Sequence, residues 1–149
     1  MDELDIHLIK LLQLDGRLSL TELSKKISLS RPSVAERLKR LQEKGIIEGF
    51  FALVPPAAVG RKLLVMVELS EIRVLGHEFE RMIVNEPDVI ECHRATGHVH
   101  YYIKAALNGM DDLTKLIENL TPYGNTRTSI LLGTPLVRRV ILPSDQLET

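Results

Sequence analysis

Two short helical patterns separated by only two residues are the feature that most constrains the fold of this chain. The first begins at Ser19, and Glu22 follows three residues later. This is the capping-box spacing, in which each side chain satisfies an exposed backbone amide of the other residue. The second begins at Ser30. Because only residues 28–29 separate the patterns, the two helices must cross steeply, which predicts a helix-turn-helix.

A third helical pattern precedes this pair and completes a three-helix unit. Its leucines recur at spacings of three, four and seven residues until Asp15 and Gly16 end the helix. The helix beginning at Ser30 carries Pro32 in its first turn, where a missing amide costs nothing, and ends at Lys44 before a glycine. We expect the three buried faces to carry Leu4, Leu8, Leu11 and Leu12, then Leu20, Leu23 and Ile27, then Val34, Leu38 and Leu41.

Charge marks the domain boundary. Residues 1–50 hold 9 basic and 8 acidic side chains, residues 51–60 hold none, and residues 61–149 hold 10 basic and 12 acidic. The uncharged stretch begins like a strand and is then interrupted by two prolines, which lack an amide donor. We predict a helix-turn-helix domain over residues 1–50, a linker strand over 51–61 and a second domain over 62–149. The apolar linker should pack against something, such as a second copy of the chain.

The second domain shows the element order β-α-β-β-α-β, which predicts an antiparallel four-stranded sheet with two helices on one face. The whole chain is therefore expected to be α+β, with an N-terminal helix-turn-helix domain joined to a ferredoxin-like domain. The expected strands span residues 63–69, 89–96, 99–107 and 126–132, the expected helices span 75–83 and 110–120, and a further strand is expected over 136–142.

Composition excludes several classes of protein. The 149 residues are 44% hydrophobic and 26% charged with a formal net charge of -1, so the chain has enough apolar material to fold. A single cysteine, Cys92, excludes an intramolecular disulfide and an all-cysteine metal site. No apolar run reaches the roughly 18 residues needed to cross a bilayer, and the start of the chain is acidic rather than basic. We expect a cytoplasmic protein that has no membrane partner.

The helix beginning at Ser30 is the candidate DNA-reading element, since the second helix of this motif enters the major groove. Between Lys25 and Glu48 there are seven basic and three acidic residues, an excess of four charges in a nearly neutral protein. Arginines can contact guanine through two nitrogens, while lysines hold phosphates. We predict base contacts from Arg31 and Arg37, and a DNA-binding set comprising Lys25, Lys26, Arg31, Ser33, Arg37, Arg40 and Lys44.

Two details complete this prediction. Glu36 disfavours a phosphate nearby, and we expect it to pair with Arg40 one helical turn later. One module of this size binds DNA weakly, so a homodimer is expected. The alternative interpretation is that the charges form only a solvated helix face, or that the three helices bind another protein.

The second domain offers an oligomer interface and a candidate ligand turn. The strand predicted over residues 63–69 is apolar on both faces, so helices should cover one face and the sheet of a partner protomer the other. The turn around Gly97 can expose amides for an anionic or carboxylate ligand. His93, His98 and His100 flank this turn, but no cysteine or carboxylate beside them makes a ligand pattern. We therefore expect surface or interface imidazoles, no metal and no cofactor.

The chain resembles the Lrp/AsnC (feast/famine) family of transcriptional regulators over nearly its whole length. The motifs that carry the resemblance are Leu4-Asp5, the run from Gln13 to Ser19, Glu22-Leu23, the run from Leu29 to Val34, the run from Arg37 to Leu41, Gly45-Ile46-Ile47 and Thr96-Gly97. The resemblance implies a DNA-binding N-terminal domain and a C-terminal domain that forms dimers and often octamers. It also implies that an amino acid or similar metabolite binds between dimers.

The resemblance also implies an effector set made of Gly97, His98, His100, Thr128 and Ser129. Family members typically carry an aspartate at the position of His100. A neutral imidazole brings no full negative charge for an effector's ammonium group. We therefore expect an altered effector preference or no effector.

Two other functions are alternatives to transcriptional regulation. One is an architectural protein that wraps DNA without a ligand. The other is an enzyme, because the sirohaem decarboxylases are similar in their two-domain plan and process a tetrapyrrole. The chain has no tryptophan to stack on a macrocycle, and its sequence shows no phosphate loop, zinc-binding helix or other catalytic motif. We expect a regulator that is not an enzyme.

Overall fold

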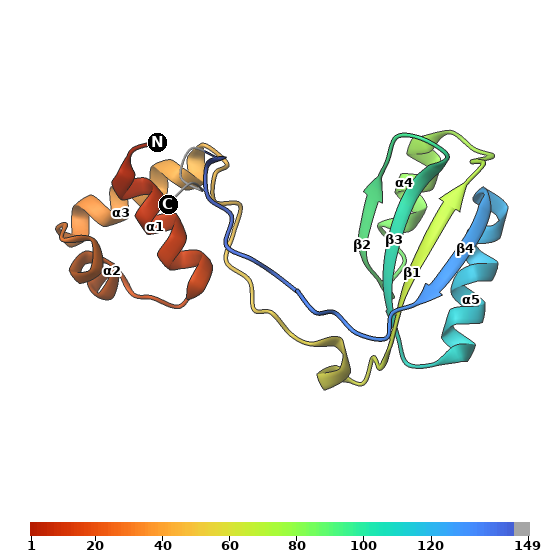
Figure 1. The fold of residues 1–149 in the computed structure, drawn as a ribbon. Helices are drawn as coiled ribbons and strands as arrows, with labels where there is room; N and C mark the ends of the chain where they lie inside the picture. Colours follow the sequence, from red (N-terminus) through yellow and green to blue (C-terminus); the bar gives the residue numbers. More distant parts are fainter. Residues whose placement is uncertain (145–149) are drawn as a thin grey trace. The chain divides into compact units, whose positions relative to one another are not determined.

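The structure, a computed structural model, describes residues 1–144, and the chain divides into two compact units. One unit contains residues 1–53 together with the C-terminal segment that begins at Leu136, and we call it the helix unit. The other contains residues 54–135, and we call it the sheet unit (Figure 1). In the described part of the chain, no helix has the length and apolar character that crossing a bilayer would require.

The helix unit contains three helices, each preceded by a capping residue. Asp2, Ser19 and Ser30 are the caps, and each accepts a hydrogen bond from an amide in the first turn of its helix. The reciprocal pairing of Ser19 with Glu22 is present, as predicted. The helices are α1 (Glu3–Leu14), α2 (Leu20–Ile27) and α3 (Arg31–Glu43).

The ends of α2 and α3 explain the sharp turns of the motif. Ser28 has a left-handed backbone with φ of 55°, which reverses the chain directly after α2. After α3, Gly45 has φ of 66° and its amide donates to the Gln42 carbonyl, while the Ile46 amide donates to Leu41. This pair of bonds is a Schellman motif, so the glycine expected at the helix end is confirmed.

The helix unit has a small core that follows the predicted stripes in part. Leu20, predicted to be buried, is instead exposed, because α2 begins at this residue and its first turn faces solvent. Leu11 and Leu38 lie at the partly exposed margin of the core. The fully packed residues are Leu8, Leu12, Leu23, Ile27, Val34 and Leu41.

The sheet unit has the predicted element order and the α+β, ferredoxin-like topology. Its four antiparallel strands run in the order β2-β3-β1-β4, and α4 and α5 cover the same face of the sheet (Figure 1). The elements are β1 (Leu63–Ser70), α4 (Gly76–Ile83), β2 (Val89–Arg94), β3 (Val99–Leu107), α5 (Met110–Leu120) and β4 (Asn125–Ile130).

Strand β1 is central, and its two faces differ. Val65, Val67 and Leu69 are fully buried in the core beneath the helices. Leu64 and Met66 alternate with them and are only partly buried, because no helix of the sheet unit covers their face. The sheet unit therefore leaves one face of its sheet partly uncovered.

Two of the expected strands are absent from the structure. The stretch over residues 51–61 is not a strand: it contains a short 3-10 helix at Pro56–Val59, since the prolines prevent ladder pairing. Residues 136–142 also form no strand, and in the structure this part of the domain expected over 62–149 lies against the helix unit. Its backbone pairs with a side chain of α1 instead of extending the sheet. Residues 145–149 of that expected domain lie outside the described residues.

Gly124 is predicted to be intolerant of a side chain. Its backbone is extended, which any residue adopts, but an added Cβ would lie 2.5 Å from the carbonyl oxygen of Ser70. Gly124→Ala should therefore lower the free energy of unfolding by about 1–3 kcal/mol, measured by urea denaturation. Gly133→Ala is the matched control, because nothing lies within 4 Å of its Cβ position. Equal stability of the two variants would contradict this packing argument.

Candidate nucleic-acid interface and effector region

The first turn of α3 presents an exposed, capped helix N-terminus. Ser30 accepts from the Ser33 amide at 3.3 Å, and the two hydroxyl oxygens lie 2.8 Å apart. Arg31 and Ser33 are both exposed. A helix N-terminus carries partial positive charge and unpaired amides. This end of α3 is therefore suited to approach a polyanion.

Four of the predicted DNA-binding residues are exposed cations. Within residues 1–144, no carboxylate oxygen lies within ion-pair distance of these four side chains. Since an unpaired ammonium or guanidinium has no internal partner to give up, it can bind a phosphate at lower cost. These residues are Lys25, Lys26, Arg31 and Lys44.

Arg37 has different surroundings, because its guanidinium faces α1. Its Nη1 atom lies 2.7 Å from Asp2 Oδ2 and 2.6 Å from Asp5 Oδ1. Asp5 is only 4% exposed and is the one buried charged residue of the described chain. Arg40 Nη2 also reaches Asp5, at 3.2 Å. We call these four residues the α1–α3 ion-pair cluster. The expected pair of Glu36 with Arg40 is not seen in the described residues, because Arg40 pairs with Asp5 instead.

Three members of the cluster, Asp2, Asp5 and Arg37, are charged at neutral pH. Burial by itself raises the pKa of Asp5, but hydrogen bonds from Arg37 and from the Asp2 amide outweigh burial and leave that pKa below its usual value. The pKa of Asp2 is lowered by the Asp5 amide and then by Arg37. Hydrogen bonds to both carboxylates raise the pKa of Arg37. Three hydrogen-bonded charges thus join the start of α1 to the middle of α3.

The residues of the predicted effector set do not form one cavity within a single chain. Gly97, with φ of 103°, lies in the hairpin between β2 and β3, whereas Thr128 and Ser129 lie on β4. Strands β2 and β4 are at opposite edges of the sheet. Thr128 also pairs with Val67 on the helix-covered side, while Ser129 pairs with Met66 on the uncovered side. A site that used all of these residues would need more than one copy of the chain.

The histidines of the hairpin lie in a polar part of the sheet. Nδ1 of His100 is buried and has no hydrogen-bond partner among residues 1–144. Nε2 of His93 lies 3.6 Å from Glu91, which also accepts a 2.7 Å hydrogen bond from Lys104. This bond is the main cause that lowers the pKa of Glu91. In the described chain, no three potential ligands gather as a metal ion would require.

The pair of Glu91 with Lys104 and the α1–α3 ion-pair cluster are both absent from the sequence predictions. The first joins neighbouring strands, so only the strand register brings the two residues together. The second joins residues 35 and 32 positions apart. A capping aspartate followed three residues later by a second aspartate was the available signal, since such a pair concentrates negative charge at the start of α1.

Arg37 and Arg31 are predicted to differ in their effect on stability. Arg37→Ala removes the guanidinium that holds Asp2 and leaves the buried Asp5 with a weaker partner, so the Tm should fall by several degrees. Arg31→Ala, at an exposed site with no ion pair among the described residues, should leave the Tm nearly unchanged. Thermal unfolding followed by circular dichroism measures both. Equal Tm values for the two variants would show that the cluster contributes nothing.

The cluster also predicts acid sensitivity. The pKa values of Asp2 and Asp5 are lower in the folded chain than in the unfolded chain, where an aspartate titrates near pH 4. Their stabilising contribution is therefore complete above that pH and is lost as the pH falls through the lowered folded values. Urea midpoints of the wild type should decrease below about pH 5. Asp5→Asn should show a weaker decrease, and a decrease identical to that of the wild type would contradict this assignment.

Comparison with known proteins agrees with this two-part architecture. Residues 1–42 match the AsnC-type helix-turn-helix domain, and residues 62–141 match the Lrp/AsnC ligand binding domain. A leucine-responsive regulatory protein from Haemophilus influenzae is 33% identical, over 89% of this chain and 84% of its own. The solved structure of LrpC from Bacillus subtilis has a TM-score of 0.87 at 29% identity, covering 93% of this chain and 99% of its own.

A second solved structure is informative because of its ligand. A transcriptional regulator from Neisseria meningitidis, solved as a complex with L-Met, has a TM-score of 0.89 at 25% identity. The match covers 99% of each chain. Its fold is thus shared by this chain from the first helix to the C-terminal segment.

Proposed function

Because this chain belongs to the Lrp/AsnC family of transcriptional regulators, we propose that it binds duplex DNA in the cytoplasm as a homo-oligomer and regulates transcription without catalysing a reaction. The observation that carries the proposal is the first turn of α3, where an exposed arginine that makes no ion pair within residues 1–144 stands beside a capped helix N-terminus. Such a turn combines a bidentate donor for a base edge with partial positive charge for phosphates.

The proposed DNA contacts fall into two groups. Arg31 and Ser33, in the first turn of α3, contact base edges. The residues outside that turn hold phosphates and set the register, since point charges on flexible stems carry little sequence information. They are Lys25, Lys26, Lys44 and, through the part of its guanidinium not engaged by Asp5, Arg40.

Arg37 is proposed to position α3 rather than to read a base. Its Nη1 makes three hydrogen bonds to Asp2 and Asp5, and its side chain is only 21% exposed. A base contact would have to compete with a partly buried ion pair, and breaking such a pair leaves Asp5 with unpaired buried charge. The guanidinium of Arg37 therefore links α3 to α1 and does not contact a base.

The uncovered face of the sheet supports a homodimer. Leu64 and Met66 of β1 lie on this face only partly buried. Packing against the same face of a second copy would remove their apolar surface from water and complete a core on that side. Larger assemblies, up to an octamer, would then bring the hairpin of one dimer close to β4 of another. This arrangement supplies the additional copies that the dispersed effector set requires.

We propose that the effector, if bound, is an amino acid or a related metabolite held near the Gly97 hairpin. The relative from Neisseria meningitidis binds L-Met. In this chain the imidazole of His100 brings no negative charge, and its buried Nδ1 has no partner among the described residues. The site would therefore favour a ligand that donates one hydrogen bond over one whose ammonium needs a carboxylate.

Arg31→Ala and Lys26→Ala are predicted to affect DNA binding in different ways. Arg31→Ala should reduce the preference for the selected sequence, a loss of about 1–3 kcal/mol of discrimination. Lys26→Ala should weaken binding to all sequences alike and reduce the slope of log affinity against log salt by about 1. Fluorescence anisotropy with specific and random duplexes across a salt series distinguishes them. Identical effects of the two variants would refute the division into base and phosphate contacts.

His100→Asp is predicted to increase amino-acid affinity. An aspartate carboxylate would pair with the ligand's ammonium group, whereas the imidazole brings no full charge. Isothermal titration calorimetry with L-Met and L-Leu should show weak or undetectable binding to the wild type and at least about tenfold tighter binding to the variant. Micromolar binding to the wild type that the substitution weakens would contradict the role given to His100.

A further inference from the structure

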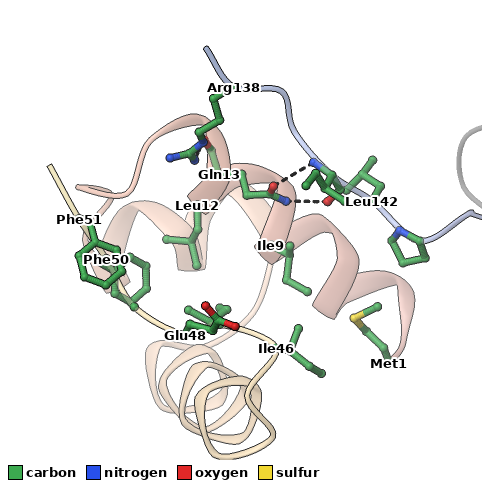
Figure 2. Close-up of a pocket in the computed structure, with 14 residues that line it drawn as sticks. Met1, Ile9, Leu12, Gln13, Ile46, Glu48, Phe50, Phe51, Arg138 and Leu142 are labelled. Atoms are coloured by element: carbon green, nitrogen blue, oxygen red, sulfur yellow. Dashed lines mark hydrogen bonds between the residues drawn. The ribbon is translucent and has the colours of Figure 1, made fainter. Parts of the chain in front are cut away.

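A single glutamine side chain attaches the C-terminal segment to α1. Gln13 Nε2 donates to the Ile141 carbonyl at 2.8 Å, and Gln13 Oε1 accepts from the Ile141 amide at 2.9 Å (Figure 2). Arg138 Nη2 adds a 2.6 Å hydrogen bond to the backbone carbonyl of Gln13. The glutamine thus satisfies both backbone groups of one residue, as a neighbouring antiparallel strand would do. We call these three hydrogen bonds the Gln13 clasp.

Apolar packing around the clasp is loose. A groove of about 540 Å³ lies between α1, the chain after α3 and the C-terminal segment. Ile141 itself is 77% exposed, so its side chain contributes little burial. Since the hydrophobic contribution scales with the apolar area removed from water, the hydrogen bonds of Gln13 supply much of the specificity of this attachment.

The clasp affects the link between the two units, because the C-terminal segment leaves the sheet unit and returns to the helix unit. Five residues, 131–135, separate this segment from the end of β4 at Ile130, and the Leu131 amide still donates to the Leu64 carbonyl in the sheet. The chain therefore passes between the helix unit and the sheet unit twice, once near residue 54 and once near residue 135. Domains joined by one passage reorient freely by default. A second passage can restrain them only while its end is anchored, and the hydrogen bonds of Gln13 and Arg138 attach this one to α1.

We propose that Gln13 is a positioning residue for DNA binding: by anchoring the C-terminal segment it restrains the helix unit, and so determines the spacing at which two copies of α3 meet DNA. This inference rests on the proposed function, because spacing has meaning only for paired copies. Affinity for a single half-site does not depend on the clasp, since Gln13 lies in α1 and outside the basic residues of α3.

The attachment itself is tested by hydrogen exchange on the full-length protein. Gln13→Leu removes both side-chain hydrogen bonds and keeps a side chain of similar length. Gln42→Leu is the matched control, because Gln42 is exposed and its side chain makes no hydrogen bond within the described residues. The Ile141 amide should exchange faster in Gln13→Leu than in the control. Equal exchange in the two variants overturns the proposal at its first step.

The positioning role is tested with duplexes that the wild type enriches from a random pool. Inserting about 5 base pairs between the half-sites rotates them by half a turn. The wild type and Gln42→Leu should lose about tenfold or more in affinity, as expected when one of two linked contacts is broken. Gln13→Leu should lose less than about threefold and should bind a single half-site as the wild type does.

Two results would overturn the inference. If Gln13→Leu exchanges faster at Ile141 but keeps the spacing preference of the wild type, the clasp exists and does not position α3. If the wild type enriches no duplex, the proposed function fails and the positioning role fails with it. The exchange experiment separates these cases, because it reports on the clasp without DNA.

Discussion

The buried carboxylate of Asp5 is the constraint on which the helix unit depends. A charged group with 4% exposure is stable only with partners, and Arg37 and Arg40 of α3 supply them. The small apolar core holds the three helices together, but dispersion and burial have little directional preference. The cluster adds direction, because hydrogen bonds to a fixed carboxylate specify the rotation of α3 about its own axis. That rotation decides whether Arg31 faces outward.

In the sheet unit, one face of the sheet is packed against helices and the other is left partly uncovered. The helices bury the Val65, Val67 and Leu69 face of β1 completely. The opposite face mixes partly buried apolar residues with the hydrogen-bonded pair of Glu91 and Lys104. Packing of such a mixed surface against a second copy would remove its apolar part from water. The uncovered sheet face is therefore the main structural support for the proposed homodimer.

Much of the fold could be predicted from sequence because its signals are local. Caps at Ser19 and Ser30 and the glycine after Lys44 define helix ends through bonds between residues two to five positions apart. The apolar stripes of the three N-terminal helices indicate most of their buried faces in the same way. These elements begin and end within a few residues of their expected positions.

The parts that sequence reasoning missed depend on contacts between distant residues. Arg37 reads as an outward arginine on a helical wheel, and only the packing of α1 against α3 shows that two aspartates face it. The segment from Leu136 reads as a strand by composition, yet its backbone is satisfied by Gln13, some 128 residues earlier in the chain. Local pattern gives no information on a partner that far away. The DNA-binding and effector residues stay predictions for the same reason, since their partners are other molecules.

Hydrogen–deuterium exchange of the full-length protein, with and without a duplex enriched by the protein, tests whether α3 is the element that contacts DNA. DNA should slow exchange at the amides of residues 25–44, most strongly in the first turn of α3, and leave the strands of the sheet unit unchanged. Slower exchange confined to the sheet unit, with α3 unaffected, would contradict this role of α3.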